Sequence, residues 1–216
     1  TYLVISMPLA IWPLYFAGGV LAILNRNWRI LAIALLAPLI LVIQAASHSV
    51  VYNGARHLIF VIPFLMITAA YGATSLAAIN TAGRLAAAAI VAVFAAVSVY
   101  NTVTLYPYQY SAYNVLVGGL SGAQGRYYVD VWRSADREAL RSVPTSLNGI
   151  PVSVFSCGSI LNMVGMAGIQ AARRPDTANY VVAQPRGCPP GNFRGFHPIY
   201  EVRRGDIVFA TVMERL

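Results

Sequence analysis

The chain has 216 residues, of which 58% are hydrophobic and only 10% are charged, whereas an average soluble domain is about 25% charged. All 15 basic residues are arginine, only four of them precede position 125, and all seven acidic residues lie beyond position 129. This distribution excludes a disordered chain, a coiled coil and a small disulfide-stapled scaffold, and it predicts a membrane region followed by a water-exposed domain.

Four apolar stretches are each close to the 20 or so helical residues that cross a bilayer, and none contains Asp, Glu, Lys or Arg. They cover residues 3–24, 30–46, 58–79 and 85–104. Prolines inside them are compatible with helices in lipid, where neighbouring helices satisfy the freed carbonyls. The sequence therefore predicts an α-helical membrane bundle of four transmembrane helices within residues 1–104.

Arginines in the short loops predict the orientation of this bundle. The loops at residues 25–29 and 80–84 carry three arginines together, and the loop at 47–57 carries one. By the positive-inside rule the first two loops are cytoplasmic. The middle loop and everything after residue 104 are then extracytoplasmic.

The remaining residues, 105–216, predict a small extracytoplasmic α/β domain. Residues 134–143 favour a helix with Ser134 as its N-cap, and β-branched residues favour strands at 151–156 and 179–184. A helix over 158–172 between these strands implies parallel pairing. Residues 199–203 and 206–213 are typical of a hairpin that turns at Arg204-Gly205.

Arg56 and His57 open the third apolar stretch and are candidate ligands of a lipid phosphate. A guanidinium beside an imidazole at the membrane surface is suited to an anionic headgroup, because Arg grips phosphate through two parallel hydrogen bonds. The alternative is that Arg56 only anchors the helix by reaching lipid phosphates.

A segment rich in tyrosine and glycine, residues 106–132, suits a sugar, because aromatic faces stack on pyranose C–H surfaces. The alternative is an interfacial aromatic belt followed by a glycine-rich turn. The candidate substrate residues, one of them from the 47–57 loop, are Tyr52, Tyr108, Tyr110, Tyr113 and Asn114.

The two cysteines, Cys157 and Cys188, either pair in an oxidising exterior or remain free thiols. The three histidines lack metal-ligand spacing, so the sequence predicts no metal and no cofactor. The arginine doublets Arg173-Arg174 and Arg203-Arg204 are separated and interleaved with acids, which predicts a solvated basic surface and no nucleic-acid partner.

Two sequence blocks resemble a known family. Val51-Tyr-Asn-Gly-Ala-Arg-His-Leu-Ile-Phe-Val-Ile-Pro63 is followed by Tyr106-Pro-Tyr-Gln-Tyr-Ser-Ala-Tyr-Asn-Val-Leu-Val-Gly-Gly119 and Gly122-Ala-Gln-Gly-Arg-Tyr-Tyr-Val-Asp-Val-Trp132. They are similar to the C-terminal part of bacterial multi-pass glycosyltransferases of the dolichyl-phosphate-mannose–protein mannosyltransferase type (family 39-like, GT-C fold). The resemblance covers residues 51–141, and residues 151–216 match only in outline.

The resemblance implies an inner-membrane enzyme that transfers a sugar, with inversion, from a polyprenyl-phosphate carrier to an unidentified extracytoplasmic acceptor. In that family the base is a carboxylate in the first outer loop. No acid precedes Asp130 here, so we expect the base upstream of this chain, an inactive fragment on its own, and a structural role for Asp130. The alternatives are a non-enzymatic, membrane-anchored binding or assembly domain and, less favoured because its spans lack ionisable residues, a transporter fragment.

Overall fold

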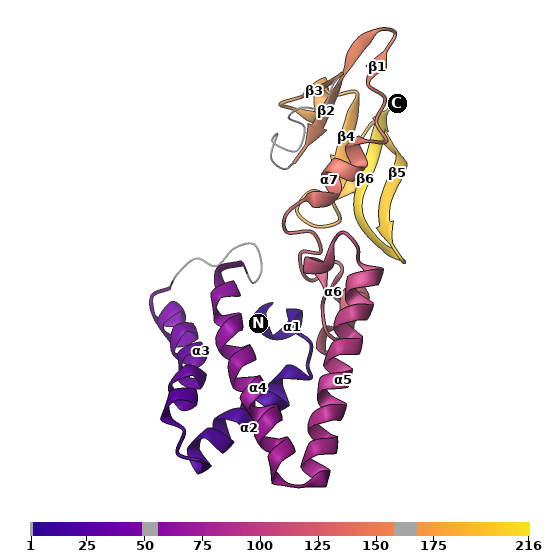
Figure 1. The fold of residues 1–216 in the computed structure, drawn as a ribbon. Coiled ribbons are helices and arrows are strands. Elements are labelled where there is room, and N and C mark those ends of the chain that lie inside the picture. The colour runs from indigo at the N-terminus through magenta and orange to yellow at the C-terminus, as the bar shows by residue number, and fades with distance from the viewer. Residues whose placement is uncertain (1, 49–55, 158–167) are drawn as a thin grey trace. The chain divides into compact units, whose positions relative to one another are not determined.

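The computed structural model describes residues 2–48, 56–157 and 168–216 (Figure 1). The chain divides into two compact units. Unit 1 comprises Thr1–Tyr106 and Ala112–Val117, and unit 2 comprises Pro107–Ser111 and Gly118–Leu216. A set of helices is thus followed in the chain by a sheet-rich C-terminal unit, and each is described by itself below.

Unit 1 is helical. Its elements are α1 (Tyr2–Ser6), α2 (Ile11–Leu24), α3 (Trp28–Ala46), the 3-10 helix η1 (Arg56–Val61), α4 (Ile62–Ile79), α5 (Thr81–Thr104) and the 3-10 helix η3 (Val115–Val117). Among the described residues, three helical segments are long and apolar enough to cross a membrane, namely Trp28–Ala46, His57–Ile79 and Thr81–Thr104. They agree with the second, third and fourth predicted spans.

The first predicted span is not one helix, so a count of four spans is not confirmed. Residues 7–10 separate α1 from α2, which has 14 residues. Pro8 supplies the physical reason, because proline lacks an amide donor and disfavours helical backbone at the residue before it. A helix of 14 residues is about 21 Å long, shorter than a hydrocarbon core of about 30 Å.

The core of unit 1 is built around α4. Leu14 of α2, Ala37 of α3 and Leu65 of α4 are buried in one apolar cluster that also includes residues of α1 and η1. The Tyr15 hydroxyl donates to the carbonyl of Ala34 at 2.7 Å, which ties α2 to α3.

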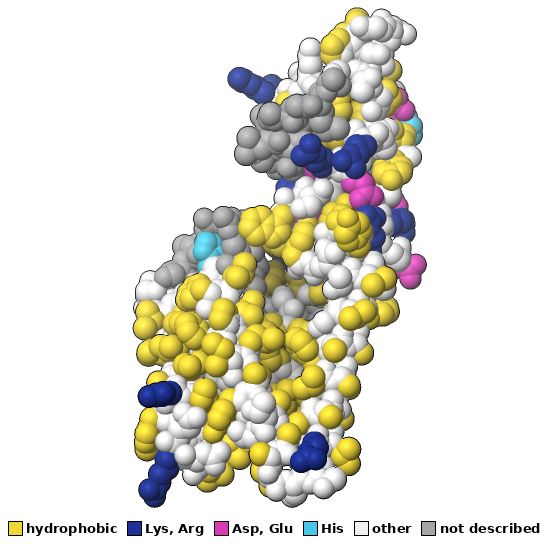
Figure 2. Space-filling model, in the orientation of Figure 1, with side chains coloured by type: hydrophobic (Ala, Val, Ile, Leu, Met, Phe, Trp, Pro, Cys, Tyr) yellow, Lys and Arg dark blue, Asp and Glu magenta, His cyan; other side chains and the backbone are white. Residues whose placement is uncertain are grey.

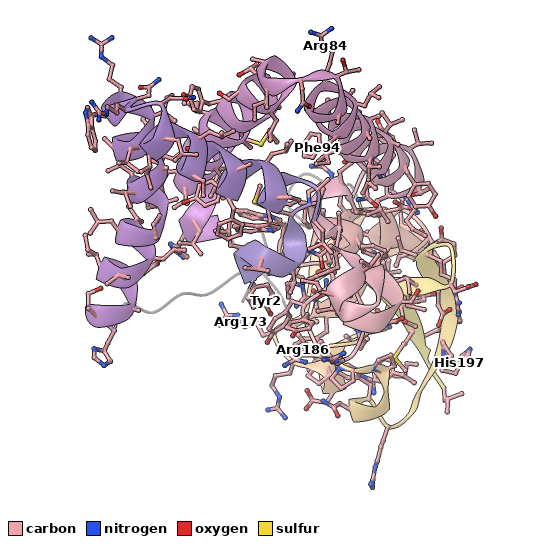
Figure 3. All side chains as sticks on the ribbon, turned by 90° about the horizontal axis from the view of Figure 1, so that it is seen from below. Tyr2, Arg84, Phe94, Arg173, Arg186 and His197 are labelled. Atoms are coloured by element: carbon pink, nitrogen blue, oxygen red, sulfur yellow. A yellow bond between two sulfur atoms is a disulfide. The ribbon has the colours of Figure 1, made fainter. Side chains whose placement is uncertain are left out.

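The α2–α3 and α4–α5 connections lie at the same end of this bundle. Asn25 donates to the Tyr71 hydroxyl at 3.1 Å, and the side chains of Asn27 and Asn80 cap the helices that follow them. On the face of unit 1 seen in Figure 2, hydrophobic side chains cover the helices and the arginines gather at this end. Figure 3 shows Arg84 projecting away from the helices there.

Unit 2 contains a six-stranded mixed sheet. The strands are β1 (Ser146–Leu147), β2 (Ile150–Ser156), β3 (Ile169–Ala171), β4 (Tyr180–Ala183), β5 (Phe196–Arg204) and β6 (Ile207–Arg215). Their order is β1-β2-β4-β6-β5, with β3 paired to β2. The parallel pairing of β2 with β4 is confirmed, as is the β5–β6 hairpin, whose ladder ends with Arg204 opposite Ile207.

Helix α7 (Ser134–Leu140) covers one face of the sheet and forms the main core with it. Val154, Val182 and Val212 point into this core, where they meet Ala139 and Leu140 of α7. The opposite face carries a smaller cluster around Val181, Met213 and Phe193. Short helices complete the unit, namely η2 (Gln109–Ser111), α6 (Gly119–Ala123), η5 (Pro175–Thr177) and η6 (Pro190–Asn192).

Two sequence predictions in this unit were wrong. Ser134 is not the N-cap of α7; the residue before it has left-handed backbone, and Asp130 accepts hydrogen bonds from the amides of Ser134 and Ala135 at 3.0 and 2.8 Å. Most of the predicted 158–172 helix lies outside the described residues, but its end is strand β3, because Ile169–Ala171 pairs in parallel with Val152–Val154.

Candidate functional site

Within unit 1, η1 lies in the same apolar cluster as α1, and the segment around Asn114 is hydrogen-bonded to residues 4–7. Leu58 and Val61 of η1 pack in the cluster that contains Leu3 and Met7. The Asn114 side chain donates to the carbonyls of Val4 and Met7 at 2.7 and 2.8 Å, and its backbone amide donates to Ile5 at 2.8 Å. Parts of both sequence blocks that carry the family resemblance therefore belong to unit 1.

His57 lies in the short turn before the long helix α4, and Pro63 marks the start of that helix. It occupies the first turn of α4, where the missing amide donor costs no hydrogen bond. The turn before it, η1, is a tighter 3-10 helix, and its second residue is the half-buried His57. The Arg56 side chain and Tyr52 lie outside the described part of the chain, so their predicted roles stay predictions.

Tyr108 has a structural position in unit 2. Only 1% of this residue is exposed, and its ring stacks on Phe209 with centroids 4.8 Å apart. Its hydroxyl donates to Glu138 Oε2 at 2.5 Å, and Arg204 donates to the same oxygen at 2.8 Å. Burial and the adjacent Glu138 carboxylate raise the pKa of Tyr108, so this phenol is a neutral hydrogen-bond donor at neutral pH.

Tyr110 is coupled to the capping carboxylate of α7. Its hydroxyl donates to Asp130 Oδ1, the atom that also accepts the Ser134 amide. Burial, followed by the charge of Asp130, raises the pKa of Tyr110. Asp130 therefore joins the tyrosine-rich segment to the start of α7, which is a structural role.

These contacts show where the predicted substrate residues lie. Tyr108 and Tyr110 belong to unit 2, and Tyr113 and Asn114 belong to unit 1. Tyr113 is 8% exposed, and the side chains of Tyr108, Tyr110 and Asn114 have protein hydrogen-bond partners. A substrate role for the four stays a prediction.

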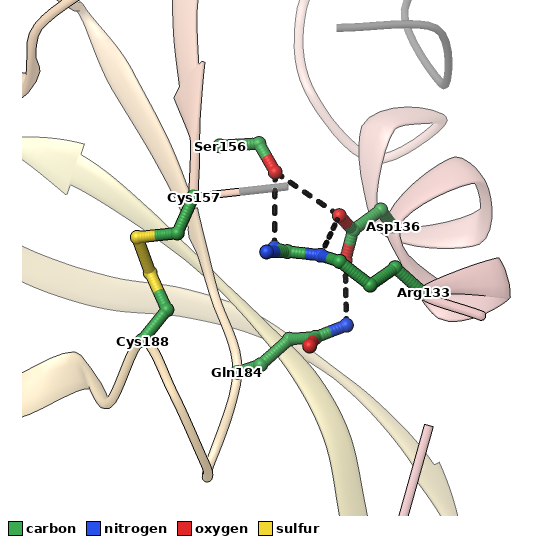
Figure 4. The surroundings of a disulfide bond; sticks show 6 residues. All are labelled: Arg133, Asp136, Ser156, Cys157, Gln184 and Cys188. Carbon is green, nitrogen blue, oxygen red and sulfur yellow. Dashed lines mark hydrogen bonds and ion pairs between the residues drawn. A yellow bond between two sulfur atoms is a disulfide. The ribbon is translucent and has the colours of Figure 1, made fainter. Parts of the chain in front are cut away.

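A buried polar network lies where the parallel strands β2 and β4 end (Figure 4). Asp136, which is fully buried, accepts hydrogen bonds from Arg133 at 2.8 Å, from the Ser156 hydroxyl at 3.0 Å and from Gln184 at 3.0 Å. Arg133 also donates to Ser156 at 3.0 Å. Burial raises the pKa of Asp136, although Arg133 opposes the shift. Carboxyl ends of parallel strands are frequent ligand sites in α/β sheets.

The structure joins Cys157 and Cys188 in a disulfide directly beside this network (Figure 4). Cys157 follows β2, and the Cys188 carbonyl accepts the backbone amide of Gln184 at 2.8 Å. The bridge therefore ties the segments that follow β2 and β4 to each other.

A small pocket of unit 2 adjoins the network through Gln184. Its principal lining residues are Tyr127, Tyr128, Asp130, Gln184, Arg186 and Phe209. Three of them belong to the sequence block at residues 122–132. Gln184 and Arg186 were not predicted, because the sequence contains no local pattern that brings them to this block; the only signal was the expected strand that ends at residue 184.

In residues 2–48, 56–157 and 168–216, no group of three or more His, Cys, Asp or Glu side chains is placed to hold a metal ion. Comparison with protein-family models, with curated proteins and with solved structures found no match to this chain.

Proposed function

We propose that the chain is the C-terminal part of an integral-membrane glycosyltransferase, which moves a sugar from a polyprenyl-phosphate carrier to an acceptor outside the inner membrane. The resemblance over residues 51–141 suggests this activity. The observation that supports it best is that parts of both sequence blocks belong to unit 1: Leu58 and Val61 of η1 share an apolar cluster with Leu3 of α1, and the Asn114 side chain donates to the carbonyls of Val4 and Met7. A phosphate-binding corner and a tyrosine-rich segment would then face the same aqueous side.

In this proposal the membrane is crossed four times. The first crossing is formed by α1 and α2 together and is interrupted at Pro8. Arg26 between α2 and α3, Arg29 in the first turn of α3 and Arg84 in the first turn of α5 lie at one end of the bundle. Between them and η1 the helices carry no acidic or basic side chain. That arrangement agrees with a cytoplasmic end rich in arginine and an extracytoplasmic end at η1.

The chemistry is a displacement at the anomeric carbon of the donor sugar. An acceptor hydroxyl attacks this carbon, a carboxylate from upstream sequence takes the hydroxyl proton, and the carrier phosphate leaves with the electrons of the broken bond. Arg56 and His57 would stabilise the phosphate as its charge develops, as preorganised cations do.

The test is transfer by the full-length protein from a radiolabelled polyprenyl-phosphate sugar, in membranes of the producing cells, which contain the acceptor. We expect Arg56→Ala to lower turnover by about 100-fold or more. The matched control is Arg29→Ala, an exposed arginine in the first turn of α3, which should leave turnover unchanged. Equal turnover by Arg56→Ala and wild type would remove Arg56 from the mechanism.

The second candidate is a non-enzymatic, membrane-anchored binding domain. It is favoured by the independence of unit 2, which has its own core, a disulfide and a pocket lined only by its own residues. Absence of transfer by the full-length wild type from any polyprenyl-phosphate sugar would favour this candidate over the enzyme.

A further inference from the structure

Two exposed arginines of unit 2, Arg126 and Arg186, lie together on its surface. The Nη1 atom of Arg186 donates to the carbonyls of Gly125 and Arg126 at 2.8 and 2.6 Å, so both arginines belong to one patch. Among the residues that the structure describes, no carboxylate forms an ion pair with either guanidinium, whereas the exposed Arg174 pairs with Asp176. The patch therefore carries two positive charges that are not neutralised within the chain.

Each of the two guanidiniums lies over a tyrosine ring. Arg126 is 5.8 Å from the ring centroid of Tyr127, and Arg186 is 5.2 Å from the ring centroid of Tyr128. Tyrosine is enriched where proteins meet the headgroup region of a bilayer, and arginine places its apolar stem there with the charge toward the headgroups. We call these four residues the arginine–tyrosine surface.

The sequence around this surface is free of acidic residues. No Asp or Glu occurs in residues 118–129 or in residues 177–200. Asp130 lies nearby, but it is buried and accepts hydrogen bonds from two backbone amides and a tyrosine hydroxyl. Glu214 pairs with His197, which lies well apart from Arg186 (Figure 3). The surface is therefore locally positive, which suits a partner that carries negative charge.

The chain tethers this surface to a helix that is long and apolar enough to cross a membrane. Helix α5 ends at Thr104, and Tyr110 follows six residues later, a distance of at most about 21 Å for an extended chain. The Tyr110 hydroxyl donates to Asp130, which is four residues beyond Arg126. Covalent geometry and this hydrogen bond therefore keep the arginine–tyrosine surface within reach of the headgroups that surround the end of α5.

We propose that the arginine–tyrosine surface docks on the bilayer, where Arg126 and Arg186 bind anionic lipid headgroups. Nε and Nη2 of Arg186 donate to no residue that the structure describes, and arginine binds phosphate through parallel hydrogen bonds. Each arginine near an anionic membrane surface favours docking by about fivefold. The inference rests on membrane insertion of α5 and not on the proposed transferase activity.

Photo-crosslinking of the full chain in proteoliposomes tests the proposal. The photoreactive residue p-benzoylphenylalanine replaces Tyr128, which is 43% exposed, or, as the control, Ile150, which is 68% exposed. Ile150 begins β2, whereas Arg186 follows the carboxyl end of β4, the strand parallel to β2. In vesicles of phosphatidylglycerol and phosphatidylcholine, we expect lipid adducts at position 128 and not at position 150. Vesicles of phosphatidylcholine alone should give a several-fold smaller yield at position 128.

Charge variants of the chain with the probe at position 128 separate electrostatic attraction from packing. Arg126→Gln and Arg186→Gln should each lower the adduct yield by about two- to fivefold, whereas Arg186→Lys, which keeps the charge, should retain most of it. Arg174→Gln is the matched control, because Arg174 is exposed, pairs with Asp176 and precedes β4. Near-ultraviolet circular dichroism verifies the tertiary packing of each variant. If the Arg186 variants lose that packing, Arg126→Gln decides the outcome.

Four results would overturn the proposal: no lipid adducts at position 128, equal yields at positions 128 and 150, a yield that is independent of lipid charge, or an equal loss in Arg174→Gln. The experiment needs no sugar donor. Charge-dependent lipid adducts in a full-length protein that transfers no sugar would therefore refute the proposed enzyme and leave the docking surface intact.

Discussion

Gly18 of α2 and Gly72 of α4 lie against each other with their backbones in contact. A methyl group on Gly72 would lie 2.1 Å from the Leu14 carbonyl oxygen and 2.7 Å from the Gly18 nitrogen. A methyl group on Gly18 would lie 2.1 Å from the carbonyl oxygen of Thr68. Helices in lipid associate closely where small residues let backbones approach, so this crossing is a main source of stability for unit 1.

We expect Gly72→Ala to destabilise unit 1 by about 1–3 kcal/mol, because the added methyl group overpacks a backbone contact. Gly19→Ala is the matched control, since a methyl group there meets nothing within 4 Å and gains the same helix propensity. Thermal unfolding of the full chain in micelles measures both. If Gly72→Ala and Gly19→Ala had the same melting temperature, the close backbone contact between α2 and α4 at Gly72 would be contradicted.

The Asp136 network predicts an effect on stability in unit 2. Asp136→Asn removes the charge partner of Arg133, whose side chain is only 18% exposed. Loss of one partner from a buried ion pair costs about 3–5 kcal/mol. Hydrogen exchange of β4 and β6 amides in the full chain measures this loss.

Asp176→Asn is the control for that variant. Its partner Arg174 is 74% exposed, and the Asp176 side chain itself is 54% exposed. Exposed ion pairs contribute about 1 kcal/mol or less. Equal protection of β4 in the two variants would show that the Asp136 network does not stabilise the sheet.

Local patterns predicted the parts of the fold that local chemistry determines. The strands at 151–156 and 179–184 and the hairpin turn were predicted from β-branched residues and from Arg204-Gly205, where Gly205 has a φ of +57°. The apolar stretch 3–24 was read as one helix because hydropathy measures composition, whereas the break depends on the backbone of Pro8. Strand β3 was missed because pairing with β2 outweighs the local preference of Ile169–Ala171.

The candidate site was less predictable, because its contacts join residues that are distant in the chain. Tyr108 was identified as a candidate, but its partners Glu138 and Arg204 lie 30 and 96 residues further on. Arg186 reaches Gly125 across 61 residues. A single sequence contains no signal for such pairs, whereas the expectation of a structural role for Asp130 followed from its place in the predicted extracytoplasmic domain.

The acid stability of unit 2 depends on Glu138. Burial raises its pKa, but the hydrogen bonds from Arg204 and Tyr108 outweigh burial, so the pKa is lowered. The folded state then binds fewer protons than the unfolded state, and the stabilisation present at neutral pH is lost as the pH falls through the lowered value. We expect Glu138→Gln to cost about 1 kcal/mol at pH 7 and much less at pH 3.

Melting curves of the full chain at pH 7 and pH 3, recorded by near-ultraviolet circular dichroism, measure this difference. Glu201→Gln is the control, because Glu201 pairs with Arg203, which is half exposed. The same cost at both pH values would show that the Glu138 carboxylate acts only as a neutral hydrogen-bond partner.

Reduction should loosen unit 2 and spare unit 1. The disulfide closes a loop between cysteines 31 residues apart, and a bridge of this span stabilises by roughly 3–4 kcal/mol in the chain-entropy model. We expect a Cys157→Ser/Cys188→Ser variant to lose hydrogen-exchange protection in β4, which ends five residues before the bridged Cys188. Unchanged protection in α4 is the internal control, and unchanged protection in β4 would refute the prediction.

The arrangement of unit 1 predicts which positions a membrane-impermeant thiol reagent reaches. Arg84→Cys lies at the arginine-rich end of the bundle, and Ser47→Cys lies at the far end of α3. If the arginine-rich end is cytoplasmic, Ser47→Cys reacts in intact cells and Arg84→Cys reacts only after permeabilisation. Trp132→Cys in unit 2 should react in intact cells as well, because the proposed topology places all residues after Thr104 on the extracytoplasmic side. Labelling of Trp132→Cys only in permeabilised cells, with Ser47→Cys labelled from outside, would separate η1 from unit 2 by the bilayer and refute the proposed transferase.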